Sequence, residues 1–265
     1  MTKAQDAKAL IDSALSDLAE QLETGKSESL TRFLDMLSRF HSYSFGNVML
    51  ILSQRPDAVR VAGYRAWQKL GRQVAKGEKG ITIIAPMVFK KDTDEAKGDG
   101  DKPVLRFKAV TAFDLAQTHG DELPEPVAVT GEPGHYLKKL TDTVRSQDIE
   151  IVTEHLSGAS GESRGGTILL DVALSDAERF SVLAHEFAHE LLHQGEAPSE
   201  RPAKAIRELE AEAVAYTVSR AVGLTTSTAS SDYIQHFGGD SKLLASVLDR
   251  VQATAATIID SVLTE

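Results

Sequence analysis

The hydrophobic positions of the first 120 residues follow a helical spacing and then a strand-like one. Apolar residues three and four positions apart predict helices over 3–24 and 28–42, and two shorter helices follow them. Over 72–91, and again from residue 104, β-branched and aromatic residues around glycine turns predict strands. The pattern therefore predicts a small α+β module over 1–120.

A second, more helical pattern follows residues 121–134, which contain three prolines and are expected to form a linker. Helices are expected over 134–147, 175–193 and 203–222 and from 230 to the end, with strands over 149–153 and 167–172 around a glycine-rich turn. The chain is therefore expected to be an α+β protein of two domains. The second domain, over 135–265, should be mostly helical with a short sheet.

Composition limits the location and the chemistry of the protein. The 265 residues include no cysteine, which excludes disulfides, thiolate metal sites and a cysteine nucleophile. The N-terminal segment is charged throughout, and no stretch reaches the roughly 18 apolar residues of a membrane span. We therefore expect a cytoplasmic protein with no membrane partner.

The charge is divided unevenly along the chain. Residues 30–91 carry 11 Lys and Arg against 3 Asp and Glu, a net of +8, within a chain whose formal net charge is −10. Residues 92–265 carry 15 basic against 30 acidic residues, a net of −15. A basic block joined to an acidic body suggests two functions in two parts of the chain.

The stretch "VLAHEFAHELLHQ" (182–194) contains the pattern H-E-x-x-H. On a helix, His185 and His189 lie one turn apart on the same face, so both imidazoles can reach one Zn²⁺. Glu186 can then act as general base on a water whose pKa the metal lowers. The alternatives are a metal site without catalysis and a solvated helix face with incidental histidines.

A second helical stretch, "RELEAEAVAY", supplies acids for the same site. Glu208 is the expected third ligand, and Glu212, four residues later, is expected to accept a hydrogen bond from a ligating histidine. His193 lies eight residues after His185, about 12 Å along a helix, so it is expected to support the site rather than to bind the metal. A site of two histidines and one carboxylate can also hold Fe, Mn or Co.

"LAHEFAHELLH" together with "ELEAEAVAY" resembles the ImmA/IrrE group of zincin metallopeptidases over roughly 135–265. The resemblance implies a zinc-peptidase fold with His185, His189 and Glu208 as ligands and Glu186 as base, although the three glutamates of "ELEAE" leave Glu212 open as the ligand. The strand "GGTILLD" would lie beside the cleft and pair with an extended peptide. Tyr216 is a candidate for stabilising the oxyanion, with helix packing as the alternative.

The basic block interleaves cations and aromatic residues, as single-strand binding requires. The candidates for contacts with DNA phosphates and bases are Tyr43, Asn47, Tyr64, Trp67, Lys69, Arg72, Lys76 and Lys79. For Trp67 the alternative is a place in the core, and for "KGEKG" it is a solvated turn.

"SFGNVMLIL", "GYRAWQKLGRQVAKGEKGITI" and "FKAVTAFDLAQT" resemble the N-terminal single-stranded-DNA-binding domain of ArdC-type antirestriction proteins. The resemblance implies single-stranded DNA as a partner. In that family such a domain precedes a zinc metallopeptidase domain, which is also the order of the two resemblances in this chain.

The leading hypothesis is a zinc metallo-endopeptidase, with one Zn²⁺ per chain, that acts on proteins at or near single-stranded DNA. The first alternative is a non-proteolytic, DNA-protecting antirestriction protein with a structural zinc site. The second is an ImmA-like peptidase that cleaves a repressor, with the N-terminal module as a protein-docking domain.

Overall fold

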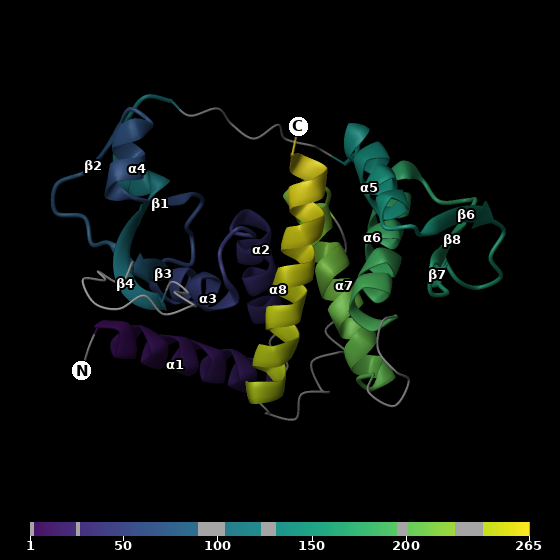
Figure 1. Cartoon of the computed structure of the whole chain (residues 1–265), viewed down its shortest axis with the longest axis horizontal. Helices are drawn as coiled ribbons and strands as arrows, with labels where there is room; N and C mark the ends of the chain where they lie inside the picture. The colour runs from purple at the N-terminus through teal and green to yellow at the C-terminus, as the bar shows by residue number, and fades with distance from the viewer. Residues whose placement is uncertain are drawn as a thin grey trace, which may run out of the picture. The chain divides into compact units, whose positions relative to one another are not determined.

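A computed structural model describes residues 3–24, 27–89, 104–122, 131–194, 201–225 and 241–264 (Figure 1). The chain is divided into two compact units. Unit 1 comprises Met1–Ala14 and Gly46–Leu123, and unit 2 comprises Leu15–Phe45 and Pro124–Glu265. Helix α1 (Lys3–Glu23) begins in unit 1 and ends in unit 2. The loop predicted after residue 91, most of the predicted linker and the start of the last predicted helix lie outside the described residues.

Unit 1 is built on two antiparallel sheets. The larger has the order β1-β4-β3, from β1 (Val61–Gly63), β4 (Val104–Asp114) and β3 (Ile81–Phe89). The smaller pairs β2 (Arg72–Val74) with β5 (Thr118–Gly120). The helical elements of the unit are α3 (Phe45–Gln54), α4 (Tyr64–Lys69) and the 3-10 turn η1 (Leu115–Gln117).

Helix α3 closes the outer edge of β3 with two side-chain amides. Asn47 donates to the carbonyl of Ile84 and accepts from its amide, both at 2.8 Å. Gln54 makes the same pair of bonds with Thr82, both at 2.9 Å. The two amides lie seven residues apart, two turns along one helix face, so they match alternate residues of the strand. An edge that would otherwise be open to pairing is therefore partly satisfied.

Unit 2 combines a small mixed sheet with a group of packed helices. Strand β8 (Thr167–Asp171) is central, parallel to β6 (Glu150–Glu154) and antiparallel to β7 (Gly161–Ser163). The helices are α2 (Ser27–Arg39), α5 (His135–Ser146), α6 (Asp176–His193), α7 (Lys204–Ala221) and α8 (Ser241–Leu263). Helix α6 packs along α7, and α7 also contacts α8 and α2 (Figure 1).

The central position of β8 corrects one expectation. The strand "GGTILLD" was expected to pair with a peptide beside the cleft, but β8 is bonded on both sides by β6 and β7. The edge strand on the site's side is β7, which lies inside the predicted glycine-rich turn. A strand of three residues containing one glycine has too little apolar alternation to be recognised from sequence.

Helix α2 belongs to unit 2, although the predicted first domain covers 1–120. Its apolar residues Leu30, Phe33, Leu34 and Leu37 are buried, and it packs on α7. Asp35 accepts hydrogen bonds from the Tyr216 hydroxyl at 2.9 Å and from Arg220 Nε at 3.0 Å. Residues 15–45 thus form one compact unit with residues 124–265. Among the described residues, no helix is both long enough and apolar enough to cross a membrane.

Candidate metal centre

Helix α6 places its two histidines on the face that meets α7. Its first turn is closed by a capping box in which Ser175 and Glu178 satisfy each other's backbone amides. Phe180, Leu183 and Phe187 are buried and anchor the helix. The side chains of a helix this well fixed keep their i, i+4 relation, so the two imidazoles lie side by side.

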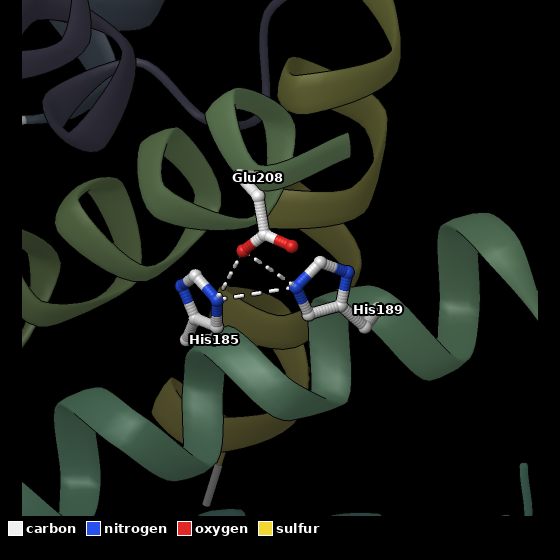
Figure 2. Close-up of side chains that lie close together, drawn as sticks. All are labelled: His185, His189 and Glu208. Atoms are coloured by element: carbon white, nitrogen blue, oxygen red, sulfur yellow. Dashed lines mark hydrogen bonds and ion pairs between the residues drawn. The ribbon is translucent and has the colours of Figure 1, made fainter. Parts of the chain in front are cut away.

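Two imidazole nitrogens and one carboxylate oxygen converge on one point (Figure 2). The Nε2 atoms of His185 and His189 lie 3.1 Å apart. The Oε2 atom of Glu208, from α7, lies 3.6 Å from Nε2 of His185 and 3.5 Å from that of His189. Ligands of a tetrahedral Zn²⁺ at about 2.0–2.1 Å are about 3.3 Å from one another. The spacing of these three atoms therefore fits a small divalent ion.

Glu212 contacts the other side of the same imidazole. Its Oε2 lies 3.4 Å from Nδ1 of His185, so Nε2 of that ring is left to face Glu208 and His189. Burial by itself lowers the pKa of His185, but the hydrogen bond that the ring donates to Glu212 and the charges of the nearby carboxylates outweigh it and leave that pKa raised. For His189, burial and the charge of His185 lower the pKa. Glu212 thus lies where a carboxylate orients a ligating histidine.

Glu186 is a buried carboxylate beside these groups, only 7% exposed. Burial raises its pKa, while the charge of His185 and the backbone amide of Ser163 act against that rise. A carboxylate with a raised pKa is suited to accept a proton near neutral pH. Gly161 lets β7 approach closely, because a Cβ there would lie 2.6 Å from Cγ1 of Val182 and 2.9 Å from Oε1 of Glu186.

Glu190, one turn after Glu186, fixes the turn that follows β7. Its Oε1 accepts from the Ser163 hydroxyl at 2.6 Å and from the Gly165 amide at 2.9 Å, and its Oε2 accepts from the Gly166 amide at 2.8 Å. Sequence reasoning missed this residue. The i, i+4 spacing of Glu186 and Glu190, together with the glycine pair at 165–166, was the available signal. These bonds hold β7 alongside α6.

The converging groups open into a cavity of about 380 Å³. Its lining residues are Gly161, Glu162, Ser163, His185, Glu186, His189, His193, Gln194, Lys204, Arg207 and Glu208. The cavity is of the size that holds a small ligand or part of a peptide. Lys204 and Arg207, on the first turns of α7, were not among the predicted site residues.

His193 lies behind His189, outside the converging group. It is 1% exposed, and its Nε2 is 3.5 Å from Oε2 of Glu210, which is fully buried and paired with Arg250. Burial, followed by the charge of His189, lowers the pKa of His193 to about 4. Tyr216, considered for the oxyanion, instead donates its hydroxyl to Asp35 and packs against α2.

Three of the predicted DNA-binding residues have structural roles instead. Trp67 is completely buried and donates from Nε1 to the carbonyl of Phe113 at 2.9 Å, so its ring cannot stack on a base. The amide of Asn47 is used on β3, as described above. The guanidinium of Arg72 donates to the Thr118 hydroxyl and to the carbonyls of Thr118 and Gly120 in β5, which leaves little of it for phosphate. The polar groups of these three side chains are therefore used within the fold, and Trp67 is also part of the core.

The other predicted DNA-binding residues lie at the surface to different degrees. Tyr64 is 47% exposed, and Lys69, Lys76 and Lys79 are exposed in unit 1. Tyr43 belongs to unit 2, where it is half-buried and packs edge-on against Phe40 with ring centroids 5.8 Å apart. Unit 1 therefore presents one aromatic residue and three lysines of the predicted set.

Comparison with known families matches both parts of the chain. Residues 5–113 match the N-terminal domain of anti-restriction factor ArdC. Residues 144–219, which include the converging histidines and glutamates, match the IrrE N-terminal-like domain, a peptidase family.

Known relatives cover nearly the whole chain. An uncharacterized protein of Bacillus anthracis is 27% identical over an alignment of 305 positions, which covers 97% of this chain and 51% of the relative. The chain thus spans about half the length of that curated relative.

Two crystal structures of the antirestriction protein ArdC from the R388 plasmid share the fold. The Mn(II)-bound form has a TM-score of 0.60 at 21% identity and covers 96% of each chain. The metal-free form has a TM-score of 0.55 at 22% identity and covers 83% of this chain and 84% of that one.

Proposed function

Because this chain joins an ArdC-type N-terminal domain to an IrrE-like domain of a peptidase family, we propose that it is a metal-dependent endopeptidase directed to single-stranded DNA. One observation carries the proposal. The side chains of His185, His189 and Glu208 converge beside the buried carboxylate of Glu186, in a cavity large enough for part of a peptide.

His185, His189 and Glu208 would hold the ion, and their donor set suits Zn²⁺, which we propose as the resident metal at one per chain. Two imidazoles and a carboxylate also suit Mn²⁺, Fe²⁺ or Co²⁺. A bound divalent ion would supply the Lewis acid that polarises the scissile carbonyl and makes the attacking water more acidic.

Glu186 would take the proton of the attacking water and pass it to the departing amine. Burial raises the pKa of Glu186, which favours the protonated form that this second step requires. The backbone amide of Ser163 holds the carboxylate in place. Glu212 keeps the ring of His185 turned toward Glu208.

Strand β7 is the edge that would align the substrate. The cross-strand bonds from Arg164 to Thr167 and from Asp171 to Ser160 show which of its residues face β8, so the main chain of Gly161 faces the other way. An extended peptide pairing there would lie beside the converging ligands.

The test compares the metal content and the cleavage activity of three proteins on a peptide mixture. We expect one zinc per wild-type chain, the same metal in Glu186→Gln, and none in His185→Ala/His189→Ala. Cleavage should fall about 10²–10⁴-fold in Glu186→Gln, because the general base is lost while the ligands remain. Cleavage that persists at the wild-type rate in Glu186→Gln would overturn the mechanism.

The DNA-binding part of the proposal is supported by the match to the ArdC N-terminal domain and by the exposed lysines of unit 1. Exposed cations and an exposed aromatic ring are the groups that bind phosphates and stack on bases. Binding of a fluorescent single-stranded oligonucleotide should weaken steeply with salt. The rival ImmA-like peptidase with a protein-docking module predicts no such binding.

A second candidate is a DNA-protecting protein that does not cleave peptides. The structural likeness of the whole chain to antirestriction ArdC favours it. In that case Glu186→Gln should protect single-stranded DNA from nuclease as well as the wild type does, and Lys76→Glu/Lys79→Glu should not.

A further inference from the structure

One side of the metal cavity is cationic. Lys204 and Arg207 line it from the start of α7, next to Glu208 on the same helix. In the described part of the chain, neither side chain forms an ion pair with a carboxylate. Other arginines of unit 2 do: Arg220 pairs with Asp35, and Arg164 with Glu162.

The surroundings of Arg207 add to the positive charge on this side of the cavity. Its Nε atom is buried, and within the described residues it has no hydrogen-bond partner. Helix α7 starts after Ala203, whose side chain cannot cap the first amides. The positive end of the helix dipole therefore adds to the charges of Lys204 and Arg207. A buried guanidinium donor without an acceptor is costly unless a ligand supplies one.

The acidic groups of the cavity are already engaged. Glu208 points at the two histidines, and the carboxylate of Glu186 accepts from the Ser163 amide. Glu162, at the rim, pairs with Arg164 at 2.7 Å. The two cations are thus left to face the cavity.

We propose that Lys204 and Arg207 form a subsite that binds an acidic side chain of the peptide, next to the bond that is cut. This inference rests on the proposed peptidase function and specifies its substrate. An acidic peptide is favoured over a nucleic-acid phosphate because strand β7 lies at the edge of its sheet and offers its main chain to a peptide.

The test measures binding and does not depend on turnover. The probes are succinic acid monohydroxamate and its amide analogue, which share the metal-chelating hydroxamate and differ only in one negative charge. On the zinc-loaded full-length protein, calorimetry should show that the acid binds about tenfold more tightly than the amide, as expected for a charge-assisted hydrogen bond. The preference should disappear in Lys204→Met/Arg207→Met.

A matched control removes the same kind of charge elsewhere. Arg145, exposed at the end of α5, is changed in Arg145→Met, and this variant should keep the tenfold preference. On peptide mixtures, wild-type cleavage sites should be enriched in Asp or Glu beside the scissile bond.

The possible outcomes distinguish a failure of the acidic subsite from a failure of the proposed peptidase function. If both hydroxamates bind zinc-loaded protein equally well, the metal centre stands and the acidic subsite is wrong. If the acid is preferred but no peptide is ever cleaved, the subsite stands and the peptidase function fails. If inorganic phosphate or a short oligonucleotide displaces the probes while succinate does not, the cations form a phosphate site and the peptide assignment is overturned. If neither hydroxamate binds, both ideas fail.

Discussion

Polar side chains that are wholly or partly buried have different partners in the two units. In unit 2, His185, His189 and Glu208 contact one another and surround a single point. In unit 1, Asp114 is 1% exposed and accepts from the backbone amides of Val59, Arg60 and Ala116. Asn47 likewise satisfies the main chain of β3.

The difference separates side chains that complete the fold from those available for chemistry. A buried group bonded to main chain has no capacity left for a ligand, and its removal leaves backbone groups unpaired. Groups that converge on a point gain most when an ion joins them. Substitutions should therefore affect stability in unit 1 and ligand binding in unit 2.

The largest effect should be on metal affinity, when Glu208 and Glu212 of α7 are substituted one at a time. Glu208→Gln should lose stoichiometric metal, because its oxygen lies 3.5–3.6 Å from both imidazole nitrogens. Glu212→Gln should retain the metal with about 10–100-fold lower affinity, because it only orients His185. Competition with a chelating dye measures both. The reverse order would make Glu212 the ligand.

The next largest effect should be on the stability of unit 1. Trp67→Ala should destabilise the protein by about 3–5 kcal/mol in urea unfolding, because it empties a fully buried site. Tyr64→Ala should change stability by less than about 0.5 kcal/mol, because Tyr64 is an exposed residue. For single-stranded DNA we expect Tyr64→Ala to weaken binding by about 1–3 kcal/mol if the ring stacks on a base. A stable Trp67→Ala protein would contradict the structural role.

A smaller effect should appear in the pH dependence of metal binding. The pKa of metal-free His185 is raised, so protons compete with the metal already at a pH above the usual range for histidine. Affinity should therefore fall as pH decreases through that value. In Glu212→Gln the pKa of His185 should drop, and the fall should move to lower pH. A titration midpoint that does not move would show that Glu212 has no influence on His185.

The smallest effect should come from the exposed lysines. Lys76→Gln/Lys79→Gln should leave stability within about 0.5 kcal/mol. The slope of log affinity for single-stranded DNA against log salt should decrease by about 0.7 for each phosphate that the variant no longer neutralises. Lys138→Gln, an exposed lysine of α5, serves as the control for net charge. Equal slopes in all three proteins would remove these lysines from the DNA-binding surface.

The sequence predicted those features that depend on residues close together along the chain, and missed those that depend on residues far apart. The pairing of His185 with His189 follows from one helical turn, so the motif predicted it. The roles of Trp67 and Arg72 depend on partners 46 residues or more away, which no local pattern reveals. Basic and aromatic residues alternate in a core-forming helix and hairpin as readily as on a binding surface. The grouping of α2 with unit 2 likewise depends on α7, more than 160 residues later.

That grouping has a practical consequence for dissecting the gene. A fragment that starts after the proline-rich segment would lack α2, and with it Phe33, Leu34 and Leu37, which are fully buried in the intact chain. The surface of α7 that they cover would then face water, and Tyr216 and Arg220 would lose Asp35. The unit that holds the candidate metal centre is therefore assembled from two separate segments, Leu15–Phe45 and Pro124–Glu265, so the two units are not separable by a single cut.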